Sequence, residues 1–123
     1  MSTTLRVLTT GTCFAVVLAS GFWLSRSGKP LNVGVSTIHK LVALAAAVLL
    51  VMTVRRLHHA APLTAGQLSV TAVTGVLFAS LAATGGLLSV DKPMPALVRV
   101  VHHLVPYLTI ISSAATFYLL LGR

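Results

Sequence analysis

Four apolar runs dominate the sequence, and each is long enough to cross a lipid bilayer as a helix. They cover residues 7–24, 33–54, 68–88 and 96–121, and a spanning helix needs about 20 such residues. Only 8% of the side chains are charged, about a third of the fraction typical of a soluble domain. We therefore expect an all-α membrane protein, an up-down-up-down bundle of four transmembrane helices that forms one domain over residues 1–123.

The first run has a second interpretation as a cleaved secretory signal, because "MSTTLR" precedes it and the small-residue stretch "VLAS" lies near its end. We expect a retained helix instead, because this run has a counterpart later in the chain. The formal charge of +8 does not indicate nucleic acid, since the basic residues lie in short connections between spans. There they are typical of membrane interfaces and of contact with anionic lipid.

The two halves of the chain resemble each other. A shift of 64 residues aligns "TGTCFA" with "TGVLFA" and Gly21 with Gly85, and a shift of 63 then aligns "KP" with "KP" and His39 with His102. We predict two tandem two-helix repeats, at about 5–57 and about 68–121. Because both repeats run in the same direction, they are parallel repeats related by a pseudo-two-fold axis along the membrane normal.

The shared positions recur at alternating spacings of three and four, which is typical of the inward seam of a left-handed bundle. This spacing predicts the inward residues of the first and third helices: Gly11, Phe14, Leu18, Gly21 and Ser25, and Gly75, Phe78, Ala82, Gly85 and Ser89.

His39 and His102 lie at matching depth on the seams of the second and fourth helices, for which Asn32 and Pro95 are the expected starts. The second and fourth helices of such a bundle are diagonal neighbours, so the two imidazoles are expected to face each other. An iron porphyrin fits between two such rings, since each nitrogen binds the metal at about 2 Å.

Gly21 and Gly85 are expected to let the flat macrocycle approach the backbone. His103 is the rival ligand on the fourth helix, but its face carries bulky residues, whereas His102 shares a face with small polar ones. A purely structural role for the histidines is the alternative. A zinc site would need more ligands than these two.

This arrangement resembles the four-helix transmembrane b-type cytochromes, in which facing histidines hold haem inside a membrane bundle. The resemblance covers the four-span layout and rests on His39, His102 and the glycines. Members of such families often carry two haems, and this chain lacks the second histidine pair. The resemblance therefore implies one haem b per chain, held between the second and fourth helices with its iron bound by His39 and His102.

Further residues are candidates for supporting roles around this cofactor. Ser36, four residues before His39, is a candidate partner for its second ring nitrogen, whereas the corresponding residue before His102 is Arg99, which cannot accept a hydrogen bond. Lys29, Lys92 and Arg99 are candidates to bind the two haem propionates. Their alternative role is anchoring at the membrane interface.

A haem with two protein ligands favours electron transfer over catalysis, although an oxidoreductase component stays open. The candidate redox partners are a quinone, a small reductant or another protein, and both a monomer and a homo-oligomer fit the sequence. The alternative function is a non-haem membrane protein, either an accessory subunit of a larger complex or a small transporter. We expect a prokaryotic inner-membrane protein with both termini in the cytoplasm.

Overall fold

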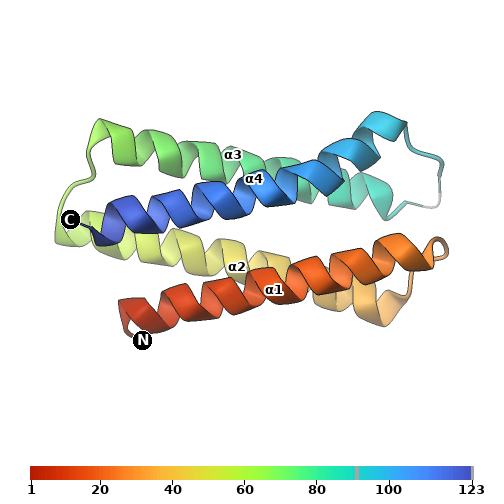
Figure 1. Cartoon of the computed structure of the whole chain (residues 1–123), viewed down its shortest axis with the longest axis horizontal. Coiled ribbons are helices and arrows are strands. Elements are labelled where there is room, and N and C mark those ends of the chain that lie inside the picture. Colours follow the sequence, from red (N-terminus) through yellow and green to blue (C-terminus); the bar gives the residue numbers. More distant parts are fainter. Residues whose placement is uncertain (91, 123) are drawn as a thin grey trace. The chain divides into compact units, whose positions relative to one another are not determined.

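The computed structural model describes residues 1–90 and 92–122 and contains four long helices in this part of the chain. They are α1 (Thr3–Ser27), α2 (Val33–Ala60), α3 (Ala65–Leu88) and α4 (Ala96–Leu121) (Figure 1). All four are long and apolar enough to cross a membrane. The prediction of four long apolar helices that could span a membrane is thus confirmed.

Short polar side chains and one glycine set the points where the helices begin and end. Asn32 caps α2 as predicted, because its Oδ1 accepts a hydrogen bond from the Val35 amide at 3.0 Å. Thr64 and Gln67 form a reciprocal capping box at the start of α3. Gly28 follows α1 with a φ of 67°, a backbone conformation that residues with a Cβ rarely adopt. The connection between α1 and α2 is therefore short and tightly turned.

The second helix extends further than the apolar pattern indicated. The apolar run ends at residue 54, but α2 continues to Ala60 and has His58 and His59 in its last turn. A helix does not need apolar side chains to continue, because its hydrogen bonds are made by the backbone, so it runs past the basic residues. Pro62 stands two residues after Ala60, and the residue before a proline disfavours helical geometry.

The chain divides into two compact units, Met1–Arg56 and Leu57–Arg123. In the first unit, α1 and α2 lie side by side in opposite directions, and in the second unit α3 and α4 do the same (Figure 1). In the second unit the Gln67 side chain on α3 donates to the Leu119 carbonyl on α4 at 3.1 Å. Each unit is thus an antiparallel pair of helices.

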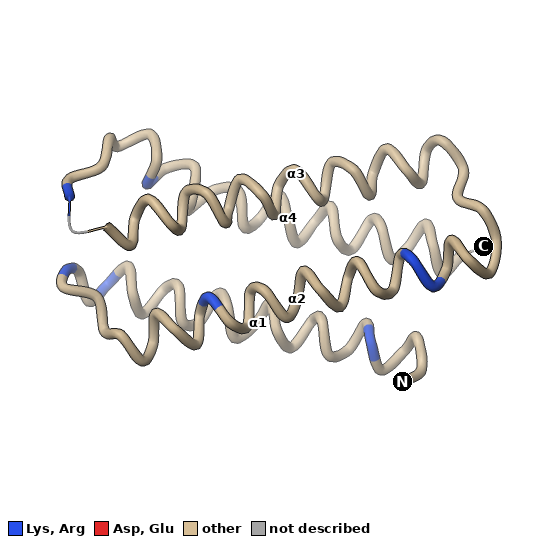
Figure 2. Tube along the Cα trace, turned by 180° about the vertical axis from the view of Figure 1, so that it is seen from behind, with Lys and Arg blue, Asp and Glu red and all other residues tan. Residues whose placement is uncertain are grey.

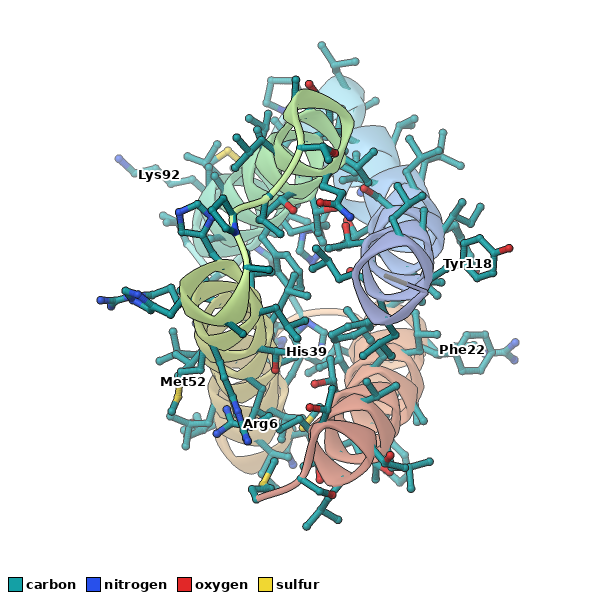
Figure 3. All side chains as sticks on the ribbon, turned by 90° about the vertical axis from the view of Figure 1, so that its left-hand side faces the viewer. Arg6, Phe22, His39, Met52, Lys92 and Tyr118 are labelled. Carbon is teal, nitrogen blue, oxygen red and sulfur yellow. The ribbon has the colours of Figure 1, made fainter. Side chains whose placement is uncertain are left out.

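Burial follows the pattern of a protein surrounded by lipid. The fully buried side chains are mostly small and hydroxylated: Thr10, Thr53, Thr74, Thr109, Ser113 and Thr116. Many large apolar side chains are exposed, among them Phe22 at 65% and Ile111 at 66%, and Figure 3 shows Phe22, Met52 and Tyr118 pointing away from their helices. Small residues let membrane helices approach closely, while apolar residues contact the hydrocarbon.

The predicted seams of α1 and α3 are right only in part: Phe14, Gly21, Phe78 and Gly85 are partly buried, but Gly75 and Ala82 are exposed. Gly11 and Leu18 are exposed, whereas Thr10 is fully buried and Val17 is partly buried. A three-four spacing fits two neighbouring stripes of a helix equally well. The buried stripe is the one that carries hydroxyl groups. These groups can be buried because each donates to a carbonyl of its own helix, as Thr10 does to Arg6 at 2.7 Å.

Candidate functional site

The His39 imidazole packs against a glycine of the neighbouring helix. His39 lies on α2, is partly buried and points toward α1 (Figure 3). A Cβ placed on Gly21 would lie only 3.0 Å from the Cε1 atom of this ring, which is tighter than nine in ten real Cβ contacts. The glycine therefore makes room for the imidazole itself, a more direct role than the predicted contact with a macrocycle.

Hydrogen bonds from α1 determine which nitrogen of His39 carries the proton. The Nδ1 atom lies 3.1 Å from the Val17 carbonyl oxygen and 3.0 Å from the Ser20 hydroxyl. The carbonyl can only accept, and the Ser20 hydroxyl already donates to the Val16 carbonyl at 2.7 Å. Nδ1 therefore donates, and the lone pair of the ring is on Nε2, the atom that would bind a metal in this tautomer.

His102 on α4 has the same environment within the second unit. A Cβ on Gly85 would lie 3.0 Å from the Cε1 atom of His102. The Nδ1 atom lies 2.8 Å from the hydroxyl of Thr84, which itself donates to the Ser80 carbonyl at 2.8 Å. With the Thr84 proton on the Ser80 carbonyl, Nδ1 of His102 donates to Thr84 and its lone pair is on Nε2, the tautomer that matches His39.

The hydroxyl partners of both rings were missed in the sequence. Ser36 was the candidate partner for His39, and no partner was found for His102. In the structure the Nδ1 atom of each ring is hydrogen-bonded to a hydroxyl of the preceding helix, Ser20 for His39 and Thr84 for His102. The repeat did contain the signal, because the 64-residue shift that aligns the two glycines also aligns Ser20 with Thr84. In each unit, a hydroxyl residue and a glycine that are adjacent in sequence hold one imidazole.

The structure also distinguishes the adjacent histidines of α4. His102 is partly buried and contacts α3 through Thr84, whereas His103 is exposed. Two consecutive residues of a helix point about 100° apart, so only one of them can face the partner helix. The environment of His102 is the one that matches His39.

The three basic residues predicted to bind propionates lie at one end of their units. Lys29 is in the connection between α1 and α2, Lys92 is in the connection between α3 and α4, and Arg99 is in the first turn of α4. All three are exposed. Figure 2 shows the basic residues mainly near the helix ends, separated by long stretches without charge. Their contact with a cofactor remains a prediction.

No group of three or more His, Cys, Asp or Glu side chains within residues 1–90 and 92–122 is arranged to hold a metal ion. The chain matches no family model, no curated protein and no solved structure.

Proposed function

We propose that the chain is a membrane b-type haem protein that transfers electrons, with His39 and His102 as the axial ligands of one haem b. The observation that supports this most is the repeated environment of the two rings. In each unit a glycine makes room for the imidazole and a hydroxyl accepts its Nδ1 proton. Axial histidines need such a second hydrogen bond, which fixes the ring and increases its basicity.

The same repetition supports the proposal that the chain consists of two tandem two-helix repeats with pseudo-two-fold symmetry in a single bundle. The pairs Ser20–Gly21 and Thr84–Gly85 occupy equivalent sequence positions, as do the two histidines. In this proposal each repeat contributes one ligand, so neither half forms the site alone.

The residues of the chain fit the cofactor through their donor set. In the Nδ1–H tautomer, Nε2 of each imidazole is the atom that would hold the iron, and Lys29, Lys92 and Arg99 would bind the propionates through charge-assisted hydrogen bonds. When bound, the haem supplies a one-electron couple. Two protein ligands keep oxygen away from the iron, which favours electron transfer. Nearby cations stabilise the reduced, less positive state and raise the reduction potential.

Orientation in the membrane follows from the charges that the cofactor does not use. One side carries Arg6, Arg55 and Arg56. Arg123 and Asp91, which the count from the sequence also included, lie outside the described residues. Cytoplasmic loops are enriched in Arg and Lys. We therefore place both termini in the cytoplasm of a prokaryotic inner membrane and the haem towards the outer face, where a quinone, a small reductant or a redox protein exchanges the electron.

A visible absorption spectrum of the detergent-purified protein tests the proposal. We expect a Soret band and split α and β bands on reduction. His39→Ala and His102→Ala should each abolish the six-coordinate spectrum, while His103→Ala, the matched control one residue away, should leave it nearly intact. A colourless protein after haem supplementation would reject the proposal and favour the accessory subunit or small transporter.

A further inference from the structure

Three arginines gather at the end of the first unit where α1 begins and α2 ends. Arg6 lies in the first turn of α1, and Arg55 and Arg56 lie near the end of α2. Of the cations in the proposed haem site, the one in this unit is Lys29, which lies at its other end. Residues 1–56 contain no Asp or Glu, so these arginines have no carboxylate partner within their own unit.

Arg6 has a buried donor that lacks an acceptor. Its side chain is only partly exposed, and the Nε atom is buried with no hydrogen-bond partner among the described residues. Figure 3 shows this side chain on the side of α1 that faces α2. A guanidinium stays charged under all physiological conditions, and a buried donor without an acceptor is costly. The rest of the Arg6 guanidinium is partly exposed and has no carboxylate counter-charge in its own unit, so a ligand with anionic oxygens would supply the missing charge.

A second guanidinium is held at the same turn of α1. The Nη1 atom of Arg56 donates to the Met1 carbonyl at 2.9 Å, and the Arg6 amide donates to the Ser2 carbonyl at 3.0 Å. Arg56 is thereby fixed beside the first turn of α1, close in sequence to Arg6, and the exposed Arg55 is its neighbour on α2. The planar guanidinium of arginine can donate two parallel hydrogen bonds to two phosphate oxygens, so it matches a phosphate in geometry as well as in charge.

The surroundings of the arginines indicate that the anion has hydrocarbon chains. Large apolar side chains next to them in sequence are exposed: Leu5 at 50%, Leu8 at 63%, Val51 at 56% and Met52 at 49%. A phospholipid satisfies both features, since its phosphate meets the guanidinium groups while its acyl chains cover the apolar side chains.

We propose that this end of the first unit binds the phosphate headgroup of an anionic phospholipid, with Arg6 as the deepest contact and Arg55 and Arg56 beside it. The proposal does not depend on haem. It agrees with the proposed cytoplasmic position of this end, because anionic lipids are concentrated in the cytoplasmic leaflet.

Native mass spectrometry of the full-length protein in neutral detergent tests the proposal, with phosphatidylglycerol, phosphatidylcholine or inorganic phosphate added. Phosphatidylglycerol should bind at least about tenfold more tightly than phosphatidylcholine, because a charge-assisted contact is worth about one decade in affinity. Arg6→Gln should weaken phosphatidylglycerol binding by about tenfold, and Arg6→Lys should weaken it less because the charge remains.

The matched control is Arg26→Gln, which removes an arginine from the other end of α1, where its guanidinium lies 5.6 Å from the centre of the Phe22 ring. This variant should bind phosphatidylglycerol as the unchanged protein does. Equal losses in the two glutamine variants would overturn the site, as would equal binding of the two lipids, a comparison that needs no variant. Displacement of the lipid by millimolar inorganic phosphate would assign the site to free phosphate instead.

Discussion

At the scale of the residue, the proposed haem site makes a prediction about the hydroxyls that lie beside the two imidazoles. Ser20→Ala and Thr84→Val each remove an acceptor that orients an imidazole. We expect each change to weaken haem binding about tenfold to a hundredfold, which is the usual effect of losing such a partner. Haem titration of the apoprotein, followed at the Soret band, measures this.

The controls for these two variants are hydroxyls that bond only to their own helix. Ser69 and Thr12 are exposed and donate to the carbonyls of Ala65 and Leu8. Ser69→Ala and Thr12→Val should leave haem affinity unchanged. If they lower it as much as the changes at Ser20 and Thr84, the loss would reflect general destabilisation and the positioning role would be wrong.

The two glycines beside the imidazoles give a second residue-scale prediction. Gly21→Ala and Gly85→Ala each put a methyl group 3.0 Å from a histidine Cε1 atom, so the ring must move away from its hydrogen-bonding hydroxyl. The reduced spectrum should lose its six-coordinate form in both variants. Gly75→Ala is the control, because a Cβ there meets nothing within 4 Å. This variant should keep the spectrum and gain up to about 1 kcal/mol of helix stability, and a normal spectrum for Gly21→Ala would contradict the prediction.

At the scale of the element, hydroxyl contacts join α3 to α4. The Thr74 hydroxyl bonds to the Ser112 hydroxyl and lies 3.2 Å from that of Thr116. Hydrogen bonds between membrane helices average about 0.6 kcal/mol and reach about 1.7 kcal/mol. Thr74→Val should therefore lower the free energy of unfolding by about 1 kcal/mol, as measured by denaturation in mixed micelles. Thr71→Val, one turn away with a hydroxyl bonded only to the Gln67 carbonyl, should cost much less, and equal costs would contradict the prediction.

The helices and the two histidines could be predicted from the sequence, but the local contacts of the histidines could not. Charged and imidazole side chains are rare in apolar runs, so His39 and His102 stand out. Ser20 and Thr84 do not stand out, because hydroxyl residues are common in this chain and most of them bond to their own helix. The end of α2 was also missed, since an apolar run stops at Arg55 whereas backbone hydrogen bonding does not.

At the scale of the whole molecule, burial and charge are both compatible with an integral membrane protein. Hydroxyl residues fill the contacts between helices, apolar side chains cover the outside, and the basic residues lie mainly near the helix ends (Figure 2). Composition predicts this much, because lipid excludes charge from the middle of each span. The side of the membrane on which each end lies depends instead on small differences in charge, so it requires a direct measurement.

Four spans require both termini and the second connection to lie on one side of the membrane and the other two connections to lie on the opposite side. In a Cys13→Ala background, which removes the single native thiol, we would place one cysteine at a time by Ser2→Cys, Ala61→Cys, Ser27→Cys or Met94→Cys. A maleimide that cannot cross the inner membrane should label Ser27→Cys and Met94→Cys in cells whose outer membrane alone has been made permeable. It should label all four variants after the inner membrane is permeabilised as well. Labelling of Ser2→Cys and Ala61→Cys from opposite sides would contradict the four spans, and a complete reversal of the pattern would place the termini outside the cytoplasm.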